Sequence, residues 1–230
     1  MQAIEFAGLI AIGAASIAKR SPNMCNGANI AYPRKIFYQV NGFEGYSNIA
    51  SGDDEFLMHK IFALSAEPHQ LAGQGVYFLK NKEATVFTRP AKKLSQFIAQ
   101  RKRWASKWGK YSDIKIKLLA IFIFTVNFCL IASIIFVIFN KCSFVQSAVG
   151  IDEPTNGVEH YAPPVAGLLI LILIKVFAEF VFLKTVMKFF SKRFKTLAFV
   201  LIELIHPFYV VFFGCLSNLG GFRWKGRKVR

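Results

Sequence analysis

Apolar residues are concentrated in the second half of this chain. After Lys115, three long apolar runs follow one another at about 116–140, 163–183 and 197–217, with more polar segments between them. A helix needs roughly 20 consecutive apolar residues to cross a bilayer, and each run reaches or approaches this length. The earlier residues show mixed polarity, turn signals and short periodic segments. The pattern therefore predicts a soluble part followed by a helical transmembrane region.

Composition supports a division into a soluble part over 1–115, a transmembrane region over 116–217 and a basic tail over 218–230. The chain is 54% hydrophobic, which is too apolar for a typical soluble domain. Its first residues do not resemble a signal peptide, because Glu5 stands where a basic residue is expected. The four cysteines have no metal-type spacing, which favours reduced thiols on a cytosolic face.

Basic residues predict the orientation of the chain, because short cytoplasmic loops are enriched in lysine and arginine. Lysines and arginines crowd the segment 101–117 and the loop 184–196, whereas the loop 141–163 carries acidic residues. We therefore expect a multi-pass protein of the cell membrane, meaning an inner or plasma membrane. Residues 1–115 would lie in the cytoplasm and the 141–163 loop outside.

The third apolar run does not fit this alternation. The tail 218–230 is strongly basic and should also lie inside, so the run 197–217 should not cross the membrane. Pro207 follows His206 near the middle of the run, and proline removes a helix hydrogen bond. We predict a broken, re-entrant or interfacial segment that packs against the first two spans. A single straight span is the competing arrangement.

Within the soluble part, periodic segments alternate between helical and extended patterns. The predicted elements are a helix over 1–18, a strand over 28–32, a helix over 33–40, a helix from Asp53, a hairpin over 75–89 and a helix over 92–109. Strands that alternate with helices are typical of an α/β fold. The strands are too few to complete a sheet.

Three adjacent acids, Asp53, Asp54 and Glu55, are unexpected in a chain with a net charge of +16. One interpretation is structural, because acids are stabilised at the first turn of a helix and Ser51 with Asp54 fits a capping pattern. The other is functional. A carboxylate that faces a ligand from a flexible loop can act as a general base towards a hydroxyl group.

A second cluster lies on the basic helix that precedes the first span. Gln100, Arg103 and Trp104 are spaced i, i+3 and i+4, so they share one helical face. A guanidinium binds phosphate oxygens through paired hydrogen bonds, and an indole stacks on a sugar ring. The alternative is an amphipathic helix that binds anionic lipid at the membrane surface.

Together the two clusters resemble the membrane-bound family 2 glycosyltransferases, which include cellulose, chitin and hyaluronan synthases. The family's acid motif is similar to the "GDD" that ends at Asp54, and its Q-x-x-R-W motif is similar to Gln100, Arg103 and Trp104. Arg101 completes the common Q-R-x-R-W form. The stretch from Cys25 through Asn26 and Gly27 resembles the family's strand–helix–G-G-F region, and 224–227 ("WKGR") resembles a C-terminal signature.

The resemblance implies a partial GT-A-type α/β catalytic domain followed by α-helical transmembrane segments. It also implies inverting transfer from a nucleotide-diphospho-sugar donor to a saccharide or lipid acceptor, with membrane lipids around the spans. Asp54 would be the catalytic base and Asp53 would bind or orient substrate. Gln100, Arg103 and Arg101 would hold the leaving diphosphate, where charge builds up. Trp104 would stack on the acceptor, and Cys25, Asn26 and Gly27 would lie near it.

This chain departs from the family in one respect. The nucleotide-binding half, with its D-x-D motif for Mg²⁺ or Mn²⁺, should precede residue 1, and no D-x-D occurs here. The ligands of that metal are therefore expected to be absent from this chain. We expect a truncated enzyme that is inactive by itself.

Three other functions are compatible with parts of the pattern. A transporter subunit would use the intramembrane charges Lys175, Glu179 and Glu203. These acids can equally pair with lysines at the membrane edge. A basic scaffold on the membrane surface would need the charge but not the "GDD" motif. Nucleic acid is not an expected partner, because the basic residues cluster at membrane edges.

Overall fold

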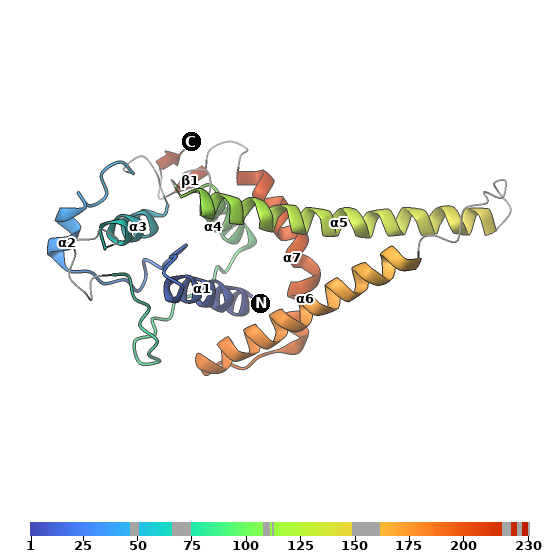
Figure 1. Ribbon diagram of the computed structural model, residues 1–230, viewed down its shortest axis with the longest axis horizontal. Helices are drawn as coiled ribbons and strands as arrows, with labels where there is room; N and C mark the ends of the chain where they lie inside the picture. The colour runs from blue at the N-terminus through green and yellow to red at the C-terminus, as the bar shows by residue number, and fades with distance from the viewer. Residues whose placement is uncertain are drawn as a thin grey trace.

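The computed structural model describes residues 1–46, 51–65, 75–107, 111, 113–148, 162–217, 222–224 and 227–229. Within them the chain is mainly helical (Figure 1). The helices are α1 (Gln2–Ala18), α2 (Arg34–Gln39), α3 (Asp53–Ser65), α4 (Leu94–Ala105), α5 (Ile114–Ala148), α6 (Ala162–Phe189) and α7 (Thr196–Ser217). Two three-residue strands, β1 (Phe222–Trp224) and β2 (Arg227–Val229), form an antiparallel hairpin.

The predicted α/β fold, including a partial GT-A-type domain, is wrong for the described part of the chain. Neither 28–32 nor the described residues of 75–89 form strands, and the two short strands lie in the C-terminal tail. Asn29 is instead held in a turn by the Asn26 carbonyl, at 2.9 Å. Alternating polarity produces a strand only where another strand pairs with its backbone, and the described residues supply no such partner here.

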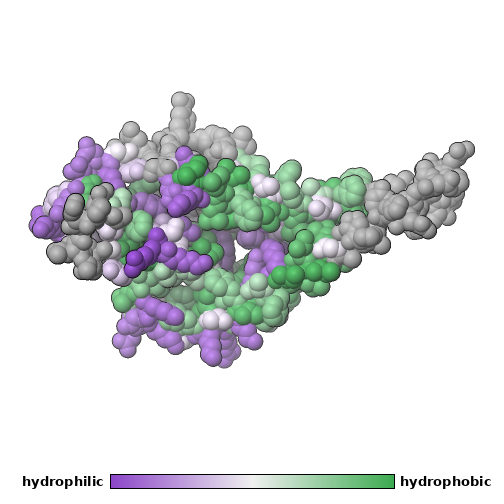
Figure 2. Space-filling model, viewed as in Figure 1, coloured by the Kyte–Doolittle hydropathy of each residue, from purple (hydrophilic) through white to green (hydrophobic). Residues whose placement is uncertain are grey.

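The predicted helices are largely present, and two of those described are long and apolar enough to cross a membrane. These stretches are Ile114–Phe139 in α5 and Thr196–Leu216 in α7. Only 6% of the most apolar window of α5 is buried inside the protein, so its side chains face outward (Figure 2). The chain therefore has the features of a membrane-associated protein. The expected span 163–183 lies in α6, which carries Lys175 and Glu179 within its apolar sequence.

The predicted break at His206 and Pro207 is not present. α7 is a single helix of 22 residues with Pro207 inside it. Proline removes one backbone hydrogen bond, and the side chain of Pro207 is buried against the rest of the protein. Packing of the surrounding turns thus preserves the helix across this position.

Two clusters of apolar contacts join helices α1 and α4 to α7. In the first, Ile4 and Ala7 of α1 pack with Leu183 and Met187 of α6 and with Phe199, near the start of α7. In the second, the ring of Phe97 in α4 lies 6.3 Å from Tyr209 and 6.4 Å from Phe213. The N-terminal helices therefore pack near both the beginning and the end of α7.

A buried ion pair joins α1 to α4. The Arg101 side chain is only 3% exposed, and its Nη2 donates to Glu5 Oε2 at 2.7 Å. The guanidinium also lies over the rings of Phe97 and Trp104, 4.8 and 4.3 Å from their centroids. A buried guanidinium needs a carboxylate partner, so Glu5 determines where α1 meets α4.

Glu5→Gln should lower the free energy of unfolding by about 3 kcal/mol, because it leaves the Arg101 guanidinium buried without a carboxylate. Denaturant unfolding of the protein in detergent measures this loss, with the exposed Glu44→Gln as the matched control. A double variant, Glu5→Leu with Arg101→Met, should recover most of the stability, since apolar replacement of a whole pair is often neutral. Equal stability of Glu5→Gln and the control would contradict this role of the pair.

Candidate functional site

The carboxylate of Asp54 is held by backbone amides at the start of α3. Its Oδ1 accepts a hydrogen bond from the Glu55 N–H at 3.0 Å, and its Oδ2 accepts one from the Gly27 N–H at 2.6 Å. A Cβ atom at residue 27 would lie 2.8 Å from Oδ2, so this approach requires glycine. The prediction that Asp54 lies at the start of a helix is confirmed, since α3 begins at Asp53.

Arg103 brings a positive charge to the same site from α4. Its Nη1 donates to the Ser51 hydroxyl at 3.0 Å. Burial lowers the pKa of Arg103, while the nearby charges of Asp54 and Asp53 oppose this shift. The structure thus brings together the predicted base and the predicted diphosphate-binding arginine, which lie far apart in the sequence.

A second contact fixes the register between α3 and the end of α4. Lys107 forms an ion pair with the buried Glu55, and the Tyr111 hydroxyl donates to the same carboxylate. Ser51–Arg103 and Glu55–Lys107 both join residues 52 positions apart. Ser51 precedes α3 and Lys107 follows α4, so the two contacts hold the start of α3 beside the end of α4.

Glu55 therefore has a different role from its two acidic neighbours. Burial raises the pKa of its carboxyl group, and the charge and hydrogen bond of Lys107 oppose that rise. Asp53 is exposed, and Asp54 faces Gly27 and Arg103. The sequence analysis missed Glu55, Lys107 and Ser51 as positioning residues. The sequence carries no signal of these pairings, because they depend on how α3 and α4 meet in space.

The predicted acceptor-side residues border Asp54. Burial raises the pKa of the Cys25 thiol, and the charges of Asp54 and Glu55 raise it further. Asn26 Oδ1 accepts from the Ala28 N–H at 3.1 Å, which shapes the turn that presents Gly27. Cys25 and Gly27 thus lie beside the Asp54 carboxylate, next to Asn26 in the same turn.

Arg101, Trp104 and Gln100, which were also predicted to bind substrate, have different surroundings. Arg101 is engaged by Glu5, and the Trp104 ring stacks on Phe6 at 6.1 Å and beneath the Arg101 guanidinium. These two side chains therefore join α1 to α4; their contact with substrate stays a prediction. The half-buried side chain of Gln100 makes no hydrogen bond within the described part of the chain.

The residues at the site do not fit a divalent cation. No group of three or more His, Cys, Asp or Glu side chains able to hold a metal occurs among the described residues. Both oxygens of Asp54 already accept backbone hydrogen bonds.

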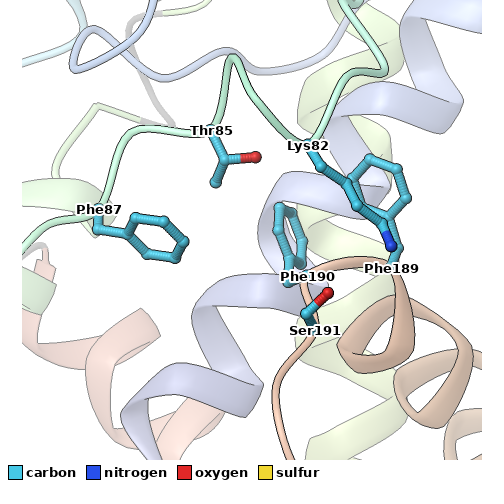
Figure 3. A pocket seen from close by; sticks show the side chains of 6 residues that line it. All are labelled: Lys82, Thr85, Phe87, Phe189, Phe190 and Ser191. Carbon is cyan, nitrogen blue, oxygen red and sulfur yellow. The ribbon is translucent and has the colours of Figure 1, made fainter.

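Two cavities lie away from Asp54 and Arg103. One of about 150 Å³ is lined by Lys82, Thr85, Phe87, Phe189, Phe190 and Ser191, between an extended segment and the end of α6 (Figure 3). The other, of about 230 Å³, lies between the end of α1 and the start of α5 and includes Lys19, Asn23 and Lys115. Neither contains a residue of the predicted site.

Comparison with known proteins does not identify a family. No family model, no curated protein and no solved structure matches the chain. The resemblance to family 2 glycosyltransferases thus depends on the motifs themselves and on the contacts between them.

The proximity of Asp54 to Cys25 can be measured without an activity assay. A raised pKa keeps the thiol protonated, so Cys25 should react slowly with iodoacetamide at pH 8, and faster only as pH rises further. Asp54→Asn removes a nearby negative charge, so the pH midpoint of alkylation should move down and the rate at pH 8 should increase severalfold.

The experiment uses protein in which Cys129, Cys142 and Cys215 are serine, with alkylation followed by mass spectrometry. Asp113→Asn, at an exposed acid, is the matched control. A midpoint that Asp54→Asn leaves unchanged would show that the two side chains do not face each other.

Proposed function

We propose that this chain carries catalytic residues of an inverting glycosyltransferase that acts at a membrane surface. The donor is a nucleotide-diphospho-sugar and the acceptor is a saccharide or lipid hydroxyl group. The observation that carries the proposal is the meeting of the Asp54 carboxylate and the Arg103 guanidinium at one site, from two different helices. A base and a cation on either side of one reacting carbon are what such a transfer requires.

In this reaction Asp54 acts as the general base. It takes the proton of the acceptor hydroxyl as that oxygen forms a bond to the anomeric carbon of the donor. The bond between the anomeric carbon and the diphosphate oxygen breaks, and its electron pair leaves with the diphosphate. Attack opposite the leaving group inverts the configuration. The hydrogen bonds from Gly27 and Glu55 hold the carboxylate in one orientation for this transfer.

Arg103 stabilises the negative charge that develops on the departing diphosphate. The Ser51 hydroxyl fixes one side of its guanidinium, and the Glu55–Lys107 pair keeps the two segments aligned. Arg101 and Trp104 act through this framework, because they hold α4 against α1.

In this proposal the reaction takes place at the cytoplasmic face of the membrane. In the proposed arrangement α5 leaves the cytoplasm and α6 returns to it, so the chain is a multi-pass protein of the cell membrane. The basic residues on both sides of the site support this orientation.

The alternative is a non-catalytic membrane protein, such as a transporter subunit or a basic surface scaffold. A transporter would use free charges among its membrane helices. Lys175 instead forms ion pairs with Glu179 at 2.9 Å and with Glu203 at 2.6 Å. These ion pairs join α6 to α7, which favours a structural role for the three side chains.

Asp54→Asn should reduce sugar transfer at least about a hundredfold, because it preserves shape and removes the base. Arg103→Lys should also lose most sugar transfer, because an ammonium cannot replace the paired guanidinium contact with phosphate. The assay uses membranes from cells that express the gene encoding this chain, with labelled nucleotide sugars. Glu44→Gln is the control and should leave transfer unchanged.

Measurements of donor binding distinguish the role of Asp54 as a base from the role of Arg103 in holding the diphosphate. Asp54→Asn should retain donor binding, since the loss belongs to the chemical step, whereas Arg103→Lys should weaken it. Normal turnover of Asp54→Asn would return this residue to a purely structural role at the start of α3.

A further inference from the structure

The cavity of about 230 Å³ at the junction of α1 and α5 has a lining of mixed chemistry. It combines the polar side chains of Lys19, Ser21, Asn23 and Lys115 with the apolar side chain of Leu119. A water molecule needs only about 10–15 Å³, so the cavity admits a polar group much larger than water. The reaction proposed for Asp54 and Arg103 leaves this cavity without a role.

Two ammonium groups reach the cavity from different helices. Lys19 is the residue that caps the end of α1, and Lys115 lies in the first turn of α5. Both are exposed, and neither side chain forms an ion pair within the described part of the chain. The neighbouring acid, Asp113, accepts the backbone N–H of Lys115 at 2.8 Å and is not part of the described lining. Two lysines without a carboxylate partner attract an anion to this place.

Asn23 brings a hydrogen-bond acceptor to the same cavity. A tight turn after α1 folds the chain back on the helix, since the Ser21 N–H donates to the Ser16 carbonyl at 3.0 Å and the Asn23 N–H donates to the Ser16 hydroxyl at 3.1 Å. The Asn23 Oδ1 atom is buried and accepts no hydrogen bond from the described residues. A buried acceptor without a donor is costly, and a ligand with a hydroxyl group would satisfy it.

The position of the cavity along α5 corresponds to the membrane surface. The apolar stretch Ile114–Phe139 has 26 residues, which is about 39 Å of helix, whereas the hydrocarbon core is about 30 Å thick. When α5 crosses the bilayer, its first turn therefore extends into the headgroup region, where the ammonium of Lys115 is solvated. Leu119 follows one turn later, about 6 Å nearer to the hydrocarbon. The cavity thus joins a cationic part at headgroup depth to an apolar part below it.

An exposed apolar face of α5 continues from the cavity towards the hydrocarbon. Its residues have the spacing i, i+3, i+4 and i+7 and share the face of Lys115, one turn earlier. Helix α7 packs elsewhere on α5, where Gly214 meets the ring of Phe124. An acyl chain can follow this face, which favours a phospholipid over a soluble phosphate ester. We call these residues the α5 stripe: Leu119, Phe122, Ile123 and Val126.

We propose that the cavity between α1 and α5 binds one anionic phospholipid whose headgroup carries a hydroxyl group. Lys19 and Lys115 bind the phosphate oxygens, and the Ser21 hydroxyl donates to them. The headgroup hydroxyl donates to Asn23 Oδ1. The acyl chains lie along the α5 stripe, so the bound lipid joins the end of α1 to the start of the membrane helix.

Native mass spectrometry of the full chain in a neutral detergent tests the proposal by counting the lipid molecules that stay bound. Three lipids with equal acyl chains separate charge from hydroxyl recognition. Phosphatidylglycerol has one negative charge and hydroxyl groups, phosphatidylmethanol has the same charge without a hydroxyl, and phosphatidylcholine has no net charge. We expect one phosphatidylglycerol to bind at least about tenfold more tightly than phosphatidylcholine, with phosphatidylmethanol between them.

Equal binding of phosphatidylglycerol and phosphatidylcholine would overturn the proposal. Equal binding of phosphatidylglycerol and phosphatidylmethanol would overturn the recognition of the hydroxyl group by Asn23. Asn23→Leu should remove the preference between these two anionic lipids. Should this variant fail to fold, the comparison of the two lipids on the unaltered chain still decides the point.

Two lysines on the same turn of α5 provide a matched pair of variants. Lys115→Gln should weaken the binding of phosphatidylglycerol about tenfold, because it removes one charge-assisted contact with the phosphate. Lys117→Gln removes the same charge two residues away, outside the described lining of the cavity, and should leave the affinity unchanged. An equal loss in both variants would overturn the proposal, because the lipid would then respond only to the general positive charge of this region.

Soluble glycerol 1-phosphate distinguishes a lipid site from a site for a free phosphate ester. It should displace phosphatidylglycerol only at concentrations far above those at which the lipid binds, because it cannot contact the α5 stripe. Displacement at the same concentration as the lipid would overturn the assignment to a phospholipid. None of these measurements involves sugar transfer, so their results are separate from those on the proposed enzymatic activity.

Discussion

Buried charge must be paired, and this requirement determines how the helices of this protein meet. The chain has 29 lysines and arginines but only 13 acids, so few carboxylates are available for buried cations. Glu5 pairs with Arg101, Glu55 with Lys107, and Glu203 with Lys175. Each pair joins a different combination of elements. Leaving one partner alone in the interior would cost several kcal/mol, which makes these contacts strong constraints on the fold.

The same constraint explains why three adjacent acids can share one helix start. Glu55 is buried and neutralises Lys107, and Asp53 faces solvent. Asp54 lies between them and is held by the Gly27 and Glu55 amides, with Arg103 nearby. The three neighbouring acids thus have different roles because they differ in burial and in their partners. Of the three, Asp54 is the one that is partly accessible and lies near a cation, as the proposed role of general base requires.

Periodicity in the sequence predicted the helices well, because apolar spacing on a helix is set by local geometry. It placed a helix start at Asp53 and put Gln100, Arg103 and Trp104 on one helix. The prediction of strands was wrong for a physical reason. An extended segment such as 75–89 becomes a strand only when another segment pairs with its backbone. The sequence also could not predict which neighbouring element each side chain of α4 contacts. Trp104 and Arg101 turn towards Phe6 and Glu5, which belong to a helix nearly a hundred residues earlier.

In the proposed function, Asp54 and Arg103 form one site that receives the diphosphate group of a nucleotide. Protection of the neighbouring Cys25 from alkylation tests it most directly, in the protein whose other cysteines are serine. Uridine or guanosine diphosphate should slow alkylation of Cys25, and Arg103→Gln should abolish this protection while leaving the rate without nucleotide similar. Absence of protection by any nucleoside diphosphate, or protection that persists in Arg103→Gln, would contradict it.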